Sequence, residues 1–139
     1  MIAIDTNILV YAVDDYEPEK KTIANELVRR LLHQSDEIVI PWQVIVEFLA
    51  IQRRWKNLGR IDEIAIGENI ADVLTAFEVV VPKVSIVTQS LSLTTRFNLS
   101  HWDSLLIAAC IEANIEILYS EDLSHQTRYH SVTVINPFI

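Results

Sequence analysis

Short runs rich in isoleucine and valine alternate with longer segments of helical periodicity along the chain of 139 residues. The runs have the length of strands, which we expect at about residues 2–4, 37–40, 78–81, 116–119 and 132–135. The intervening segments predict helices at about residues 17–32, 42–55, 61–76, 84–97 and 102–113. Such alternation is typical of α/β proteins in which helices cover a parallel sheet, and this is the fold class that we expect.

Length and composition predict one compact domain over residues 1–139. A chain of this size, half of it apolar, can bury most of the surface that its unfolded form exposes. Its longest apolar stretches, residues 44–51 and 105–111, are far shorter than the roughly 18 to 20 residues of a membrane helix. The amino terminus also lacks the basic residues of a secretory signal. Because Cys110 is the only cysteine, no intrachain disulfide is possible, and we expect a cytoplasmic location.

Two classes of cofactor site are disfavoured by what the chain lacks. Only two glycines, Gly59 and Gly67, are present, which excludes a glycine-rich phosphate loop and a dinucleotide-binding fingerprint. The four histidines show no ligand spacing with Cys110, and this disfavours zinc. Nucleotide cofactors and a zinc centre are therefore not expected.

Glu47 is the acidic residue whose position most needs an explanation. It lies within the sequence VIVEFLAI, where nearly every face of the expected helix is apolar. Burying an unpaired carboxylate costs several kcal/mol, so the side chain must be protonated, paired with a cation or bound to a metal. A buried ion pair with an arginine is the structural alternative, but Arg54 lies about 10 Å further along the helix. Contact with a metal or a substrate is therefore favoured.

Three further acids lie where they could join Glu47. Asp5 and Asp122 each follow an expected strand, and the functional crevice of a parallel sheet lies beyond the carboxyl ends of its strands. Either aspartate could instead serve only as a turn or helix cap. Asp103 begins a helix three residues after Ser100, a spacing typical of a capping box. Its dense apolar surroundings nevertheless indicate the edge of a cleft, where the helix amino terminus would keep the carboxylate ionised.

Convergent carboxylates repel one another, and a hard cation such as Mg²⁺ or Mn²⁺ removes that conflict. The formal net charge of −8 argues against generic electrostatic binding of nucleic acid. Removing the four candidate acids from that total leaves −4, and bound cations would neutralise the cleft further. The objection from charge is thereby weakened.

Five segments carry a family resemblance: AIDTNILVYA, PWQVIVEFLA, LSHWDSLLIAACIEA, LYSEDLSHQ and VINPF. In this order they resemble the PIN-domain family, closest to the VapC-like toxins of prokaryotic toxin–antitoxin pairs, over essentially the full chain. The resemblance implies a three-layer α/β/α fold with a central parallel sheet and an endoribonuclease that depends on Mg²⁺ or Mn²⁺ and leaves 5′-phosphate and 3′-hydroxyl ends. It also implies a homodimer and a cognate antitoxin that covers the cleft and places an arginine among the carboxylates.

Position by position, the resemblance carries over four acidic metal ligands and two supporting polar residues. The ligands are Asp5, Glu47, Asp103 and Asp122, and the supporting residues are Asn7 and Ser120. Ser120 stands where the family commonly has threonine, and Gln126 follows His125 where the family usually has glycine. Glu121 could take the place of Asp122 as the fourth ligand.

A basic stretch free of acids continues from the helix that carries Glu47. Its cations could grip phosphates that flank the cleaved bond, or could simply form a solvated helix end. Trp55 within it could stack on a base or pack in the core. The basic residues are Arg53, Arg54, Lys56 and Arg60.

Two other functions remain open from the residues alone. One is a metal-dependent phosphatase, although the motif Asp5-Thr6-Asn7 lacks the second aspartate of the haloacid-dehalogenase pattern, and a helical Glu47 has no role there. The other is a catalytically silent PIN-fold module that binds RNA or a protein partner. Retention of all four acids favours the enzyme over the silent module.

Overall fold

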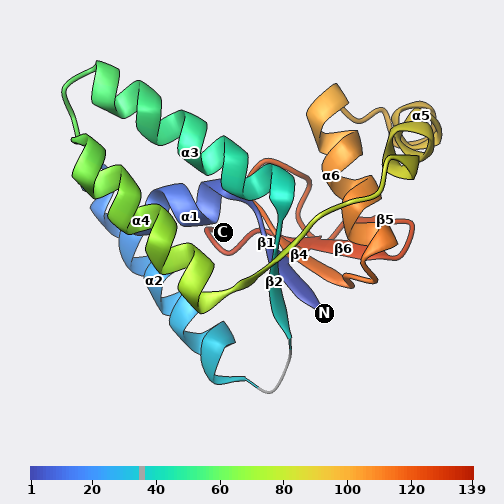
Figure 1. Cartoon of the computed structure of the whole chain (residues 1–139). Coiled ribbons are helices and arrows are strands. Elements are labelled where there is room, and N and C mark those ends of the chain that lie inside the picture. The colour runs from blue at the N-terminus through green and yellow to red at the C-terminus, as the bar shows by residue number, and fades with distance from the viewer. Residues whose placement is uncertain (35–36) are drawn as a thin grey trace.

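A computed structural model describes residues 1–34 and 37–139 of the chain (Figure 1). Six strands form one sheet in the order β3-β2-β1-β4-β6-β5. All neighbouring strands run parallel except β5 and β6, which pair antiparallel. The strands are β1 (Ile2–Ile4), β2 (Ile38–Pro41), β3 (Glu78–Val80), β4 (Ile117–Tyr119), β5 (Arg128–Tyr129) and β6 (Val132–Ile135).

Helices cover both faces of this sheet, which gives three layers. Figure 1 shows α1 to α4 on one side of the strands and α5 with α6 on the other. Contacts join α1 to α2 and to α3, and α3 to α4, whereas α5 packs against α6. The helices are α1 (Thr6–Val13), α2 (Pro18–His33), α3 (Trp42–Asn57), α4 (Glu63–Ala76), α5 (Ser85–Phe97) and α6 (His101–Glu112).

The α/β/α architecture expected from the sequence is confirmed, with two additions. The sheet gains β5, an antiparallel edge strand of only two residues, so the sheet is mostly rather than wholly parallel. Helix α1 is absent from the expected helices, because its sequence TNILVYAV is rich in the β-branched and aromatic residues that favour strands. The side chain of Asp5 caps this helix, and its packing against α2 and α3 supplies what local propensity lacks.

The central strands and the apolar faces of α3 and α6 make the core. Ile4 of β1, Leu118 of β4 and Phe48 of α3 are all buried. In parallel register, Ile4 lies beside Tyr119, and the amide of Asp5 donates to the Tyr119 carbonyl at 2.9 Å. The residues that follow β1 and β4 are therefore held side by side at one edge of the sheet.

None of the helices in residues 1–34 and 37–139 is long and apolar enough to cross a membrane. Cys110 is fully buried in α6. Burial raises the pKa of its thiol far above the ordinary value, which makes the thiol an unreactive part of the core.

Candidate active site

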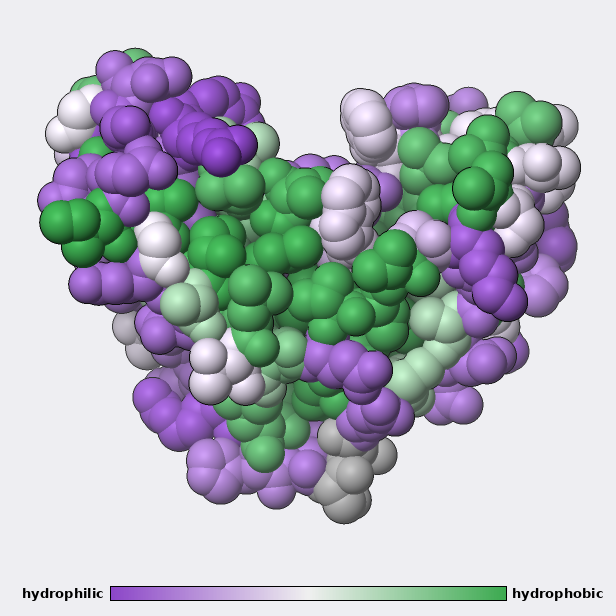
Figure 2. Space-filling model, viewed as in Figure 1, coloured by the Kyte–Doolittle hydropathy of each residue, from purple (hydrophilic) through white to green (hydrophobic). Residues whose placement is uncertain are grey.

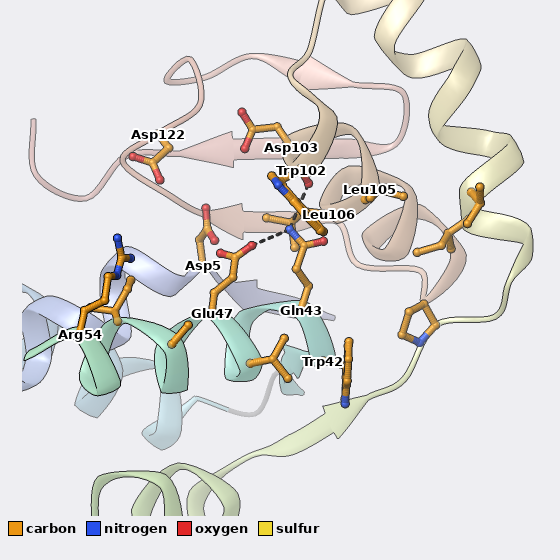
Figure 3. Close-up of a pocket in the computed structure, with 16 residues that line it drawn as sticks. Asp5, Trp42, Gln43, Glu47, Arg54, Trp102, Asp103, Leu105, Leu106 and Asp122 are labelled. Atoms are coloured by element: carbon orange, nitrogen blue, oxygen red, sulfur yellow. Dashed lines mark hydrogen bonds between the residues drawn. The ribbon is translucent and has the colours of Figure 1, made fainter. Parts of the chain in front are cut away.

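The four predicted acidic ligands all line one cavity of about 780 Å³ (Figure 3). They come from four separate parts of the chain: Asp5 follows β1, Glu47 lies within α3, Asp103 lies in the first turn of α6, and Asp122 follows β4. The parallel sheet brings Asp5 and Asp122 to its carboxyl edge, where α3 and α6 add the other two. This is where the functional crevice of such a sheet is expected.

Asp5 is both a helix cap and a wall of the cavity. Its Oδ1 accepts a hydrogen bond from the Thr6 amide at 2.7 Å, and its Oδ2 accepts one from the Ser120 hydroxyl at 2.7 Å. Burial raises the pKa of this carboxyl to about 6 in spite of those two donors, and the negative charges of Asp122 and Glu47 raise it further. The folded protein therefore carries an electrostatic strain that a cation in the cavity would relieve.

Replacing Asp5 with asparagine should stabilise the metal-free protein at neutral pH. Because the folded pKa of about 6 exceeds the ordinary 3.8, the protonated carboxyl contributes stability that is fully present below pH 3.8 and is lost as the pH rises through 6. At roughly 1.4 kcal/mol per pKa unit, the loss amounts to about 3 kcal/mol. Asparagine stays neutral, so thermal unfolding in EDTA should show a higher melting temperature for the variant at pH 8 and a narrowing gap towards pH 4.

An exposed aspartate provides the control for this measurement. Asp72 lies on the solvent side of α4, so Asp72→Asn should follow the wild type across the whole pH range. An Asp5→Asn variant that melts below the wild type at pH 8 would contradict the electrostatic account of Asp5.

Glu47 is half-buried and accepts two neutral hydrogen bonds. The Thr6 hydroxyl donates to its Oε2 at 2.8 Å, and the Gln43 side-chain amide donates to its Oε1 at 2.8 Å. Within the described residues no lysine or arginine pairs with Glu47, so the alternative of a buried ion pair is not supported. Its face of α3 turns to the cavity, which explains why a carboxylate is tolerated in so apolar a segment.

Gln43 also ties α3 to the start of α6. The same side-chain amide donates to the Trp102 carbonyl at 3.1 Å, beside Asp103 (Figure 3). Sequence reasoning missed both Gln43 and Thr6. The helical spacing of four residues between Gln43 and Glu47 was the available signal for the first, whereas the position of Thr6 next to Asp5 gave no comparable signal.

Asp103 fulfils both interpretations of its sequence. The Ser100 hydroxyl accepts a hydrogen bond from the Asp103 amide at 3.3 Å and caps α6, while the Asp103 carboxylate faces the cavity. Asp103 is therefore both part of the first turn of α6 and part of the cavity wall.

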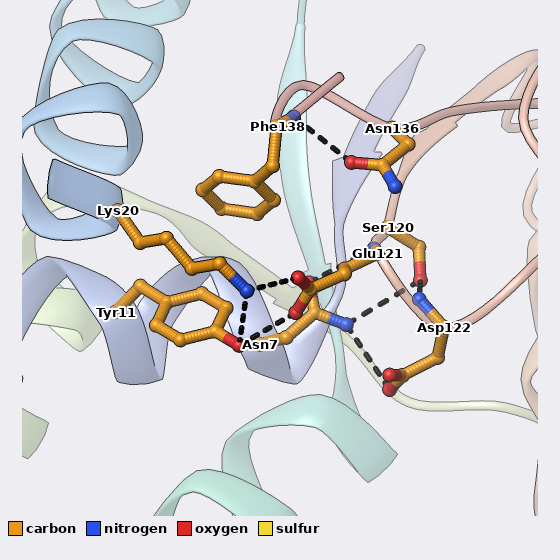
Figure 4. Close-up of polar contacts among 8 residues, drawn as sticks. All are labelled: Asn7, Tyr11, Lys20, Ser120, Glu121, Asp122, Asn136 and Phe138. Carbon is orange, nitrogen blue, oxygen red and sulfur yellow. Dashed lines mark hydrogen bonds and ion pairs between the residues drawn. The ribbon is translucent and has the colours of Figure 1, made fainter. Parts of the chain in front are cut away.

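Asp122 is held by the two residues expected to support the site. The Asn7 side-chain amide donates to its Oδ2 at 3.1 Å, and its backbone amide donates to the Ser120 hydroxyl at 3.1 Å. Glu121, in contrast, does not line the cavity, and its carboxylate accepts hydrogen bonds from Tyr11 at 2.6 Å and from Lys20 (Figure 4). Of the two neighbouring acids, Asp122 is the one that faces the other carboxylates.

The ligand atoms available here, carboxylate oxygens, are of the chemical type that a hard divalent cation prefers. Four carboxylates share one cavity, and the buried one has a raised pKa, which is the conflict that such an ion resolves. Among residues 1–34 and 37–139, however, no three acidic, histidine or cysteine side chains are close enough to hold a metal as they stand.

The PIN domain family model matches residues 2–129. The chain belongs to the PIN domain family. PIN domains of the VapC type are nucleases, and PIN nucleases generally use divalent metal ions.

Solved structures of toxin–antitoxin proteins share the fold of this PIN domain at low sequence identity. VapBC-1 from nontypeable Haemophilus influenzae matches with a TM-score of 0.70 and 16% identity, covering 100% of both chains. A toxin–antitoxin complex from Klebsiella pneumoniae gives 0.68 and 15%, covering 99% of this chain and 98% of the other. VapC20 from Mycobacterium tuberculosis, described as a toxin that cleaves the sarcin–ricin loop, gives 0.66 and 17%, covering 88% and 90%. A comparison with curated proteins found no match.

The basic residues of the PIN domain do not form one surface. Arg54 lines the cavity and Arg53 is exposed on α3, but Lys56 pairs with Glu63 at 2.7 Å. Arg60 pairs with Asp14 at 2.9 Å, and its guanidinium lies over the rings of Tyr16 and Trp55 at 4.0 and 4.5 Å. Trp55 itself is buried, which supports the interpretation that it packs in the core.

The rest of the cavity wall is apolar. Trp42 and Trp102 both line it, and Trp102 is 62% exposed, which is unusual for so large an aromatic side chain. Figure 2 shows hydrophobic surface below the depression that separates the lobe of α3 and α4 from the lobe of α5 and α6. The PIN domain thus offers an acidic end and an aromatic, apolar wall within one cavity.

Proposed function

We propose that this PIN domain, acting as a single nuclease domain over residues 1–139, is an endoribonuclease that depends on Mg²⁺ or Mn²⁺ and serves as the toxin of a type II toxin–antitoxin pair. The observation that carries the proposal is the meeting of Asp5, Glu47, Asp103 and Asp122 in one cavity of a PIN fold. The phosphatase has no role for the helical Glu47 in this cavity, and the silent binding module does not explain why all four carboxylates are retained there.

The four carboxylates would hold the cation. Mg²⁺ keeps several of its waters and needs only one or two direct carboxylate ligands, which suits acids that are spread around the cavity. When bound, a divalent ion lowers the pKa of a water molecule and stabilises negative charge on a phosphate.

The protein's own side chains prepare the site for in-line hydrolysis of a phosphodiester. Thr6 and Gln43 donate to Glu47 and fix its carboxylate in an accepting orientation. Asn7 orients Asp122 in the same way. Asp103 lies in the first turn of α6, where the helix begins at the cavity. The side chains around the cavity therefore hold the acids in place to bind and orient.

RNA would lie along the cavity with phosphate at the acidic end. Arg54 lies at the cavity wall, where it can contact a flanking phosphate. Trp42 and Trp102 offer exposed rings on which unpaired bases can stack. Arg60 and Lys56, already paired with acidic side chains, are less suited to this role than Arg53 and Arg54.

An antitoxin and a second copy of the chain complete the proposal. The Haemophilus and Klebsiella structures are described as VapBC-1 and a toxin–antitoxin complex. An acidic cavity with an apolar wall suits a partner segment that carries a basic side chain among apolar ones. Co-purification of a small second polypeptide and a homodimer in solution are the expected observations, together with a cytoplasmic location.

The chemistry of the product ends tests the proposed reaction. Purified protein is incubated with structured RNA in Mg²⁺ or Mn²⁺, and the fragments are analysed for terminal phosphate. From the resemblance to PIN nucleases we expect fragments with a 5′-phosphate and a 3′-hydroxyl, and a 2′,3′-cyclic phosphate would contradict this expectation. Hydrolysis of a small phosphate ester without RNA cleavage would favour the phosphatase, and RNA binding without any cleavage would favour the silent module.

A further inference from the structure

A second polar cluster lies outside the cavity, around the carboxylate of Glu121, which precedes Asp122 in the chain. We call it the Glu121 clamp, and it consists of Tyr11, Lys20 and Glu121 (Figure 4). The Tyr11 hydroxyl donates to Glu121 Oε2 at 2.6 Å, the Lys20 ammonium pairs with Glu121 Oε1, and Lys20 also donates to the Tyr11 hydroxyl at 3.1 Å. The clamp joins α1 and α2 to the turn that follows β4.

The clamp is a half-buried unit rather than a surface ion pair. The side chains of Lys20 and Glu121 are 34% and 25% exposed, and the ammonium lies 4.6 Å from the centre of the Tyr11 ring and 5.6 Å from that of Phe138. Burial acts to raise the pKa of Glu121, but hydrogen bonds from Lys20 and Tyr11 outweigh it and hold that pKa below its ordinary value. A charged pair in such surroundings is held more firmly than an exposed one.

The clamp is connected to Asp122 through the backbone and Asn7. The Glu121 amide donates to Asn7 Oδ1 at 3.2 Å, and Asn7 in turn donates to Asp122 Oδ2 at 3.1 Å. Glu121 is thus held from both ends, by its side chain against α1 and α2 and by its amide against Asn7. With Glu121 fixed outside the cavity, the next side chain, Asp122, faces into it.

We propose that Lys20 and Tyr11 are positioning residues for the candidate metal site, because they hold Glu121 away from the cavity and thereby fix the turn that presents Asp122. The inference rests on the proposed function, since it concerns how the same carboxylates receive a cation. It assigns Glu121 a supporting role and makes Asp122 the fourth acid of the site.

Simple electrostatics and the Glu121 clamp predict opposite changes in cation affinity for the substitution Lys20→Met. Lys20→Met removes a positive charge that repels a cation bound at the nearby acids, so Coulomb interactions alone would strengthen cation binding. The clamp predicts weaker binding, because the released Glu121 lets the turn and Asp122 move. Lys21→Met is the matched control, since Lys21 is the neighbouring residue and pairs with the exposed Asp15.

Binding of Mn²⁺ to the full chain without RNA, measured by titration calorimetry, tests the clamp. Lys20→Met should raise the dissociation constant by about tenfold, as for other residues that orient metal ligands, with a melting temperature close to that of the wild type. RNA cleavage by the same variant should lose kcat while KM stays unchanged. Lys20→Arg should recover most of the affinity, Tyr11→Phe should show a smaller loss, and Lys21→Met should bind as the wild type does or slightly tighter.

The outcomes separate the clamp from the proposed function. Wild-type affinity in both Lys20→Met and Tyr11→Phe would overturn the clamp and leave the metal-dependent nuclease standing. A wild type that binds no Mn²⁺ would overturn the proposed function and the clamp with it. If Lys20→Met fails to fold, Tyr11→Phe decides: weaker Mn²⁺ binding by a folded variant supports the clamp, and unchanged binding contradicts it.

Discussion

Glu47→Gln should lower the rate of RNA cleavage in Mg²⁺ by about 1000-fold, the equivalent of several kcal/mol of lost transition-state stabilisation. Glutamine has the shape of glutamate and can still accept the hydrogen bond from Thr6, so the fold should persist. It lacks the negative charge, and its NH2 group would face the NH2 group of Gln43 in place of the carboxylate oxygen that accepts from Gln43 in the wild type. Single-turnover cleavage of RNA with the variant in excess would measure the loss directly.

Glu63 provides the matched control for this substitution. It is an exposed glutamate at the start of α4, paired with Lys56, so Glu63→Gln should cleave at the wild-type rate. Both variants should melt within a few degrees of the wild type. A Glu47→Gln enzyme that keeps more than a tenth of the activity would mean that Glu47 does not belong to the reacting site.

Phe48→Ala, one residue further along α3, should lower the stability of the fold and leave the cleavage activity of the folded protein nearly unchanged. Phe48 is 1% exposed and among the largest fully buried side chains, so its truncation should cost about 3 to 5 kcal/mol. That is a large part of the roughly 5 to 15 kcal/mol that stabilises an ordinary domain. Urea unfolding should show the midpoint fall at nearly constant slope, while activity per folded molecule stays close to that of the wild type at low temperature.

Leu74→Ala serves as the comparison, because Leu74 is 54% exposed on α4. Its truncation should cost less than about 1 kcal/mol. A similarly small cost for Phe48→Ala would show that α3 does not anchor the core as described. Together, residues 47 and 48 should separate the chemistry of the site from the stability of the fold.

Much of the fold could be predicted because hydrophobic periodicity reports burial directly. Strands β1, β2, β3, β4 and β6 and helices α2 to α6 lie within one or two residues of their expected ranges. The exceptions, α1 and β5, depend on tertiary contacts: α1 on its packing against α2 and α3, and β5 on its pairing with β6. Local propensity carries no signal for either contact.

The candidate site was predictable in its acids and not in its hydrogen bonds. Asp5 and Asp122 follow strands of a parallel sheet, and Glu47 interrupts an apolar helix; each is a feature of sequence that burial or topology explains. The pairing of Lys20 with Glu121 joins residues 101 positions apart, which no spacing rule reveals. Arg54 and Arg60 belong to one basic stretch of the sequence, yet α3 ends at Asn57 and Arg60 pairs with Asp14. The basic side chains of this stretch are therefore separated in the structure.

The most direct test of the carboxylate site is cleavage of a structured RNA mixture by wild-type protein and Asp103→Asn, purified in parallel and free of any antitoxin. Each protein is assayed with Mg²⁺, with Mn²⁺ and with EDTA, and the variant controls for contaminating nucleases. We expect the wild type to cleave only when a divalent ion is present and the variant to be inactive under all conditions. Cleavage in EDTA, equal cleavage by the variant, or no cleavage of any RNA by the wild type with either metal would contradict the account.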